Sequence, residues 1–343
     1  MSITIARRML FWTGVGMLWS NLAVRCLAQE RFEYTQPEMG LPFRIVLYGP
    51  DRATADAAAA EAFGRVKELN DIMSDYDAES ELGRLSRSSG EGRWVKVSAD
   101  LWKVLQLSRA LSERSGGKFD VTVGPCVNLW RKARREGRLP DPERLAKAQR
   151  SVGFQKMLLD PENHAVKLVA PEMRIDLGAI AKGYAVDEAL AVLTSRGIHQ
   201  ALVAGGGDMA VGDPPPAKKG WRVKLQPLDT TNAPPAKYVL LARCGLGTSG
   251  DAFQKLEING KRYSHIIDPF TGIGLTDHSL VTVIGPDCFT ADPLATTVSV
   301  LGPEAGVRLV EATPGMVVRV VREPEERIQL YESKGFARYY EPE

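Results

Sequence analysis

Cysteine and histidine are scarce in this sequence, with four of each among 343 residues. Cys26, Cys126, Cys244 and Cys288 are far apart, and there is neither a CxxC pair nor a histidine at zinc-site spacing. This pattern argues against a structural zinc site. We expect the last three cysteines to be small buried hydrophobic residues. One disulfide among them stays open, since the sequence does not specify which two would pair.

The chain also lacks several features that mark other protein classes. Its formal charge of +2 gives no electrostatic footprint for nucleic acid. G-x-x-x-x-G-K-[ST] does not occur, which excludes a P-loop; G-x-G-x-x-G occurs at Gly245–Gly250, but within a predicted strand and not between a strand and a helix, so it is no dinucleotide fingerprint. No repeat of fixed period and no low-complexity tract is present. What remains is a chain with 44% apolar and 25% charged residues, which is ordinary for a globular protein.

The longest apolar run is short and lies at the N-terminus. Arg7 and Arg8 precede the apolar residues 9–24, and the small residue Ala28 follows. This order is typical of a secretory signal, cleaved after Ala28, so we expect an exported, periplasmic protein. An uncleaved inner-membrane anchor is the alternative, although the apolar run is shorter than the roughly 20 residues that a membrane span needs. The paired arginines also hint weakly at a twin-arginine signal.

Beyond the predicted signal at residues 1–28, no linker divides the chain, and we expect residues 29–343 to form one domain. The predicted helices cover residues 53–74, 101–117, 179–197, 290–302 and 303–315, and the predicted strands include residues 43–48, 221–228, 237–250, 278–285 and 316–323. Helices and strands are mixed without strict alternation, which predicts an α+β or mixed-sheet α/β fold.

One predicted helix carries an acid and a hydroxyl near its start. The helix opens at Thr290 and has Pro293 in its first turn, where proline is tolerated. Asp292 and Thr296 are four residues apart and therefore share one face. Such oxygen ligands suit Mg²⁺, although a helix cap and a hydroxyl bonded back to the helix would explain them equally well.

Glycines mark three further strand ends. Asp176 and Gly178 join a short strand to a helix that begins near Ala179, an arrangement that can present backbone N–H groups to a phosphate. An ordinary strand–helix turn is the alternative. The segments Gly205–Asp208 and Gly247–Asp251 allow close approach of the backbone, or are simply tight turns.

His265 lies in the segment SHIIDP, three residues before Asp268. A lone histidine on a strand is more often structural than catalytic. Here Asp268 could orient the imidazole, which favours a role in proton transfer.

Taken together and in this order, MSDYDAESEL, DVTVGPCVNLW, DLGAIAKGYAVD, GGGD, TSGD, SHIIDP and TADPLAT resemble the ApbE family of FAD:protein FMN transferases, from about Met39 to Val321. The resemblance implies an ApbE-like fold with mixed sheets flanked by helices. It also implies a Mg²⁺-dependent enzyme outside the cytoplasm that splits FAD at its pyrophosphate. FMN is joined by a phosphoester to a threonine or serine of an acceptor flavoprotein, and AMP is released.

The resemblance further implies the roles of particular residues. The metal ligands would be Asp292, Thr296 and the carbonyl of Ala179; the FAD contacts would be Met39, Tyr76, Lys118, Phe119, Asp120, Asp176, Lys182 and Ile267; and His265 would be catalytic. Pro293 stands where the family commonly has alanine. Hydrolysis of FAD to FMN and AMP, flavin binding without turnover, and docking to a membrane redox complex stay open as alternatives.

Overall fold

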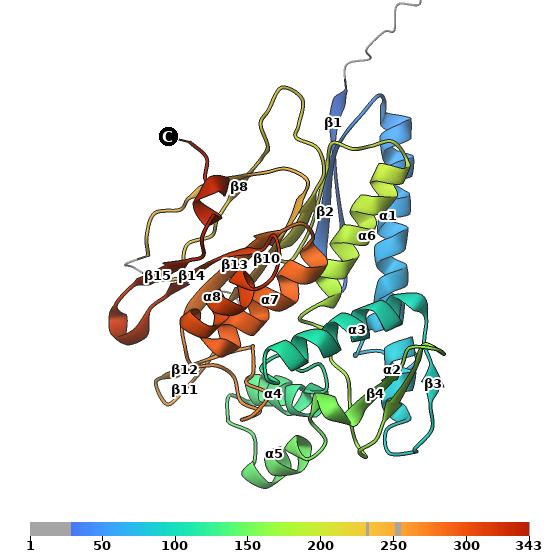
Figure 1. Cartoon of the computed structure of the whole chain (residues 1–343), viewed down its shortest axis with the longest axis vertical. Helices are drawn as coiled ribbons and strands as arrows, with labels where there is room; N and C mark the ends of the chain where they lie inside the picture. The colour runs from blue at the N-terminus through green and yellow to red at the C-terminus, as the bar shows by residue number, and fades with distance from the viewer. Residues whose placement is uncertain (1–28, 231–232, 251–254, 343) are drawn as a thin grey trace, which may run out of the picture.

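The structure, a computed structural model, describes residues 29–230, 233–250 and 255–342 (Figure 1). The predicted signal segment and Asp251 lie outside these residues. None of the helices in the described ranges is both long enough and apolar enough to cross a membrane.

An eight-stranded sheet forms the centre of the molecule (Figure 1). Its strands lie in the order β1 (Glu30–Glu38), β2 (Leu41–Gly49), β6 (Ala201–Gly205), β7 (Asp208–Val211), β10 (Cys244–Gly250), β13 (Ser279–Gly285), β14 (Val317–Arg322) and β15 (Gln329–Glu332). Every neighbouring pair is antiparallel. The glycine segment Gly205–Asp208 is therefore the tight turn of the β6–β7 hairpin.

Two apolar layers cover the two faces of this sheet. On one face pack α1 (Arg52–Met73), α6 (Ala181–Ser195), α7 (Cys288–Leu301) and α8 (Pro303–Glu311). On the other pack β8 (Trp221–Lys224), β9 (Tyr238–Leu241) and the 3₁₀ turn η3 (Phe336–Tyr339). The predicted α+β class is confirmed.

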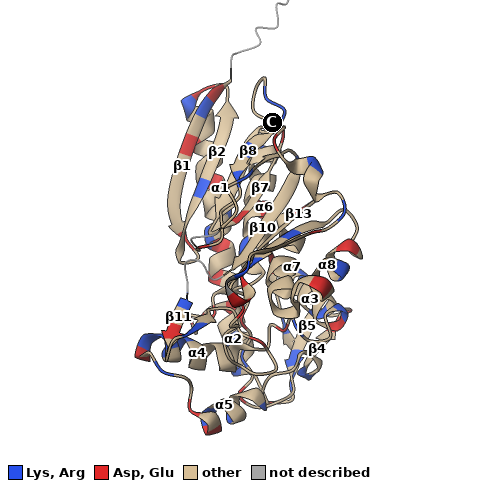
Figure 2. Ribbon diagram, turned by 90° about the vertical axis from the view of Figure 1, so that its left-hand side faces the viewer, with Lys and Arg blue, Asp and Glu red and all other residues tan. Residues whose placement is uncertain are grey.

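The remaining elements lie below the sheet in Figure 2, where α4, α5 and β11 are visible. They are α2 (Glu81–Arg87), β3 (Val95–Lys96), α3 (Ala99–Arg114), α4 (Gly124–Glu136), α5 (Pro142–Gln149), η1 (Phe154–Lys156), β4 (Met157–Asp160), β5 (Ala165–Leu168), β11 (Lys255–Ile258) and β12 (Lys261–Ser264), whereas the 3₁₀ turn η2 (Pro324–Glu326) connects β14 to β15 within the sheet. The strand predicted before α6 is only a single bridge between Val123 and Arg174.

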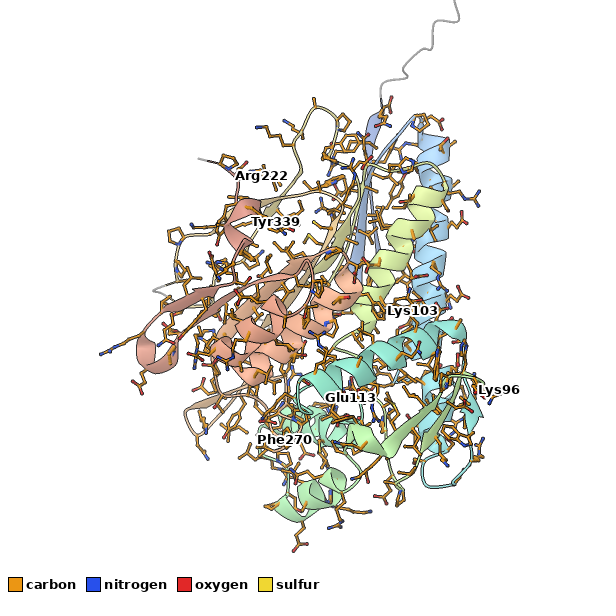
Figure 3. The ribbon with its side chains drawn as sticks, in the orientation of Figure 1. Lys96, Lys103, Glu113, Arg222, Phe270 and Tyr339 are labelled. Atoms are coloured by element: carbon orange, nitrogen blue, oxygen red, sulfur yellow. The ribbon has the colours of Figure 1, made fainter. Side chains whose placement is uncertain are left out.

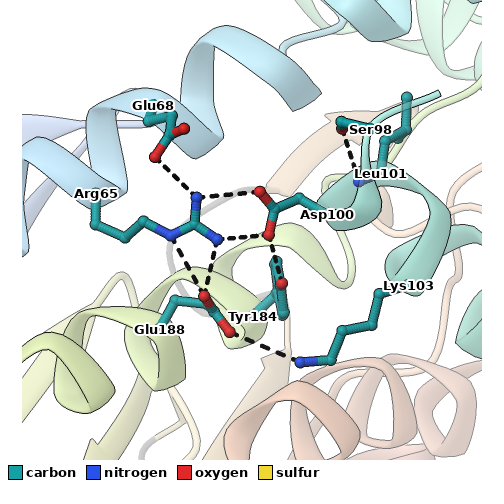
Figure 4. A network of polar contacts seen from close by, with 8 residues as sticks. All are labelled: Arg65, Glu68, Ser98, Asp100, Leu101, Lys103, Tyr184 and Glu188. Carbon is teal, nitrogen blue, oxygen red and sulfur yellow. Dashed lines mark hydrogen bonds and ion pairs between the residues drawn. The ribbon is translucent and has the colours of Figure 1, made fainter. Parts of the chain in front are cut away.

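A polar network ties α6 to its neighbours (Figure 4). Arg65 of α1 donates to Asp100 of α3 at 3.0 Å and to Glu188 of α6 at 2.8 Å. The Tyr184 hydroxyl donates to Asp100 at 2.6 Å. The guanidinium is mostly shielded from water, with 19% of the Arg65 side chain exposed, so these ion pairs hold three helices more firmly than exposed pairs would. The network thereby fixes the helix whose first turn reaches the site described next.

Candidate functional site

A cavity of about 750 Å³ lies between the sheet, the first turns of α6 and α7, and α4. It is lined by most of the residues named from the sequence, namely Tyr76, Lys118, Phe119, Asp120, Asp176, Ala179, Lys182, His265, Ile267, Asp292 and Thr296. Met39 is not in the lining. It occupies the turn between β1 and β2 with a φ of 50°, and its neighbours Leu41 and Pro42 reach the cavity instead.

Three charged side chains meet at the base of the cavity. Lys182 Nζ lies 2.7 Å from Asp208 Oδ2 and 3.2 Å from Asp292 Oδ2. The two carboxylates are almost fully buried, with 1% of Asp208 and 2% of Asp292 exposed. Buried charges are tolerated only when paired, so these residues hold one another in place.

Asp292 reaches this position because α7 starts beside α6. Asp287 caps α7 by accepting from the Thr290 N–H at 2.7 Å. Asp187 of α6 accepts from the N–H groups of Cys288 at 3.1 Å and of Phe289 at 2.7 Å. Two carboxylates therefore satisfy N–H groups that a helix start leaves unbonded, and they fix the first turn of α7.

Glycines let the backbones around Asp292 approach closely. A Cβ on Gly183 would lie 2.4 Å from the Cys288 carbonyl oxygen, and one on Gly247 would lie 2.5 Å from the Asp292 nitrogen. The Gly183 N–H donates to Asp292 Oδ2 at 2.9 Å. Because Gly183 lies in the first turn of α6, its N–H has no partner within the helix, and the Asp292 carboxylate provides one.

The electrostatics of the cluster favour a further cation. Burial and the neighbouring charge of Asp292 raise the pKa of Asp208 to about 6. Burial disfavours the charged form of Lys182, but Asp208 and Asp292 outweigh it and raise the pKa of the ammonium. Two carboxylates facing one ammonium leave an excess of negative charge when all three are ionised.

Any metal held here would need hydroxyl or carbonyl ligands in addition to a carboxylate. Within the described residues, no group of three acidic, histidine or cysteine side chains is placed to hold a metal ion. Thr296, which has a hydroxyl oxygen, and Ala179, which has a backbone carbonyl oxygen, line the cavity together with Asp292. The Ser249 hydroxyl lies 3.4 Å from that of Thr296. Hard oxygen donors of this mixed kind suit Mg²⁺ better than Zn²⁺.

Asp176 belongs to a second charged cluster. Arg131 donates to Asp176 Oδ2 at 2.8 Å, contacts Asp75, and lies over the Tyr76 ring at 4.4 Å from its centre. Burial and the charge of Asp75 raise the pKa of Asp176. The Gly178 N–H donates to Asp176 Oδ1 at 2.8 Å, so this N–H serves the turn itself; phosphate binding at this junction stays a prediction.

Lys118 and Asp120 occupy the next part of the lining with different surroundings. Lys118 Nζ donates to Asp268 at 3.0 Å and lies 4.6 Å from the centre of the Phe270 ring, which is labelled in Figure 3. Asp120 accepts from the N–H groups of Thr122 and Phe154, both at 2.8 Å. Burial raises the pKa of Asp120. Asp120 therefore shapes the wall of the cavity, whereas Lys118 stands at its rim.

His265 follows β12 and lines the same cavity. The segment is anchored by Trp130, whose indole N–H donates to the Ser264 carbonyl at 3.0 Å. Both oxygens of Asp268 accept from other donors, the Lys118 ammonium and the Phe270 N–H. The orientation of His265 by Asp268 stays a prediction.

Several lining residues were not named as site residues from the sequence. Asp208 lies in the glycine segment, but its pairing with Lys182 depends on the sheet order. Arg131 and Arg134 gave no sequence signal, because the lining face of α4 is known only once its packing is known. The three cysteines of the described chain are buried and free, as expected for small hydrophobic residues.

Comparison with known proteins identifies the family. The model of the ApbE family matches residues 39–320. The chain belongs to the ApbE family. It is similar to the FAD:protein FMN transferase of Haemophilus influenzae, with 33% identity over 280 residues, covering 80% of this chain and 81% of that protein. For the Vibrio cholerae protein of the same name, identity is 30% over 311 residues, covering 90% and 92%.

Solved structures of this family share the fold. The flavin transferase ApbE from Vibrio cholerae superposes with a TM-score of 0.82 at 30% identity, covering 91% of this chain and 99% of that chain. The ApbE protein from Thermotoga maritima gives a TM-score of 0.80 at 26% identity, covering 91% and 100%. The family resemblance and its predicted fold are thus confirmed.

Proposed function

We propose that this chain transfers FMN from FAD to a threonine or serine hydroxyl of an acceptor flavoprotein. The hydroxyl oxygen bonds to the phosphorus of the FMN half, the bond from that phosphorus to the AMP half breaks, and AMP leaves. Family membership and the names of the relatives support this proposal. The observation that carries it is the buried cluster of Lys182, Asp208 and Asp292 at the base of a cavity large enough for a nucleotide.

Lys182 provides a fixed positive charge beside the predicted diphosphate. Its ammonium is held between two buried carboxylates, so little reorganisation is needed when charge develops on the phosphate oxygens. Positioning and charge stabilisation account for most of the catalysis of phosphoryl transfer.

The donor chemistry of the cluster fits a magnesium ion. Asp292, Thr296 and the carbonyl of Ala179 would hold the ion. Its charge would offset the negative charge that Asp208 and Asp292 leave in excess of the single ammonium of Lys182. When bound, magnesium would neutralise negative charge on the phosphates.

We expect His265 to receive the proton of the attacking hydroxyl. The support is that His265, on the segment after β12, lines the same cavity as Asp292. Imidazole accepts protons near neutral pH, which suits a general base in this reaction.

The aromatic rim offers a surface for the rings of FAD. Tyr76 is 80% exposed although it lines the cavity, and Arg131 lies against its ring. An exposed aromatic face of this kind can stack on the isoalloxazine ring. Ile267, which is buried in the lining, would add apolar contact.

We further propose that the protein is exported and acts on an acceptor outside the cytoplasm. The support is the order of basic, apolar and small residues before Ala28. Acceptors on membrane redox complexes are the candidates that this location favours.

The test is a labelling assay with the chain from residue 29 onward, FAD, Mg²⁺ and a purified acceptor flavoprotein. We expect equimolar AMP and covalently bound flavin fluorescence on the acceptor, and neither product when EDTA is present. AMP without labelling would replace the proposal with FAD hydrolysis. Neither product, despite FAD binding, would leave a flavin-binding protein.

A further inference from the structure

The strand β8 has one open edge. Leu225, just after β8, donates its N–H to the Lys237 carbonyl at 2.8 Å. In an antiparallel pair, alternate residues exchange these bonds, so Val223 and Leu225 face β9 with their backbone groups. The backbone N–H and C=O groups of Arg222 and Lys224 therefore point to the opposite edge of β8.

The other strand of this pair is already flanked. The Glu341 N–H donates to the Tyr238 carbonyl at 2.9 Å, and Tyr340 forms a bridge with Val239. Arg222, labelled in Figure 3, reaches over β9 to the same C-terminal segment, where its Nε lies 2.9 Å from the Glu341 carboxylate. Among the described residues, the edge carrying Lys224 has no strand paired to it.

This open edge borders the reaction cavity. Val223, Lys224, Leu225 and Gln226 all line it, and no residue of β9 does. Successive side chains of a strand point to opposite faces. Four successive residues can line one cavity only where the cavity reaches the edge of the strand. Val223 and Leu225 pack toward the sheet, while Lys224 and Gln226 are exposed.

We propose that an extended segment of the acceptor protein adds to the open edge of β8 as a further strand and so delivers its hydroxyl to the cavity. The inference rests on the proposed function, which requires a protein segment to enter a cavity that also holds FAD. Unpaired strand edges are ready templates for such addition, and the backbone hydrogen bonds supply affinity with little demand on sequence.

The experiment compares Lys224→Pro with Lys224→Ala, using the acceptor flavoprotein that the chain labels. Both variants lose the lysine side chain, but only proline removes the N–H at the open edge and blocks an incoming strand. Because that N–H does not bond to β9, the β8–β9 pair is kept. We expect the KM for the acceptor to be at least about tenfold higher for Lys224→Pro than for Lys224→Ala, with equal KM values for FAD, as for about 1.4 kcal/mol of lost binding.

A second measurement leaves the enzyme unchanged. Acceptor peptides N-methylated at single backbone positions around the hydroxyl should lose labelling at every second position, because only alternate N–H groups face β8. Equal acceptor KM values for the two variants, or no alternation, would overturn the inference. So would a dimer of this chain that dissociates in Lys224→Pro without change in labelling. Failure of the unmodified chain to label any acceptor would instead refute the proposed function.

Discussion

The base and the rim of the cavity hold their charges in different ways. At the base, Asp208 and Asp292 are almost fully buried and are locked to Lys182 by distances of 2.7 and 3.2 Å. At the rim, Tyr76 is 80% exposed, and its ring lies against the guanidinium of Arg131. The base is thus pre-organised for chemistry, whereas the rim can adapt to a ligand.

This contrast follows from the backbone. The base is formed where α6, α7 and β10 approach each other across glycines, so any added atom would displace a helix. The rim residues stand on the segment after α1, on α4 and on the turn after β12; α4 and the turn after β12 pack together in a separate small apolar cluster. We therefore expect changes at the base to affect turnover and stability strongly, and changes at the rim to affect mainly binding.

The largest effect should come from Asp292→Ala. It removes a proposed magnesium ligand and one of the two carboxylates that hold Lys182, so we expect AMP release to fall at least about 100-fold, by analogy with loss of other charge-stabilising groups. The measurement is AMP release at saturating FAD and Mg²⁺. Turnover like that of the unchanged chain would remove Asp292 from the mechanism.

The next largest effect concerns packing. Gly183→Ala places a methyl group 2.4 Å from the Cys288 carbonyl oxygen, and we expect a loss of about 1–3 kcal/mol in the free energy of unfolding. Gly64→Ala is the matched control, since Gly64 is also helical but exposed, with no atom within 4 Å of the added Cβ. Its expected gain is about 0.5–1 kcal/mol. Chemical denaturation measures the free energy of unfolding of both variants. Similar free energies for the two would contradict the close approach of α6 and α7 at Gly183.

The pH dependence of stability should report on Asp187. Burial raises the pKa of this carboxyl to about 7 in the folded chain, whereas about 3.9 is usual in an unfolded chain. The folded state therefore keeps the proton longer, and stability falls as the pH rises from about 4 to about 7. Asp187→Asn should remove most of that fall, which for a difference of about 3 pKa units amounts to roughly 4 kcal/mol. Urea denaturation at intervals across this range checks it, and an unchanged slope would mean that Asp187 titrates normally.

The smallest effect is expected at the rim. Tyr76→Ala should weaken FAD binding by about fivefold, as for an exposed aromatic contact of about 1 kcal/mol, with little change in thermal stability. Trp94→Ala is the control, because Trp94 is also exposed and contacts a lysine, but does not line the cavity. Titration of FAD by flavin fluorescence measures both. Equal affinities for the two variants would show that the rim does not bind the flavin dinucleotide.

Local patterns in the sequence predicted elements whose ends are set by nearby residues. The helix that carries Asp292 and Thr296 was expected to open at Thr290. It begins two residues before that, at Cys288, because Asp287 is its N-cap. The long helix expected over residues 53–74 is α1, at Arg52–Met73. Apolar periodicity and capping side chains are local, so the sequence displays them directly.

What the sequence did not display depends on contacts between distant segments. The pairing of Lys182 with Asp208 requires α6 to pack against β7, and the exposure of Arg131 to the cavity requires the packing of α4. The strand β1 was missed because its side chains are mostly exposed, and it is held by pairing with β2 rather than by an apolar pattern. The family resemblance supplied most site residues, while their mutual contacts came from the fold.

The most direct test of FMN transfer is the intact mass of the acceptor after incubation with the chain, FAD and Mg²⁺, measured together with AMP. The predicted result is an acceptor heavier by one phosphoester-linked FMN, carried on a threonine or serine, with one AMP released for each acceptor labelled. An acceptor of unchanged mass while AMP accumulates would contradict it.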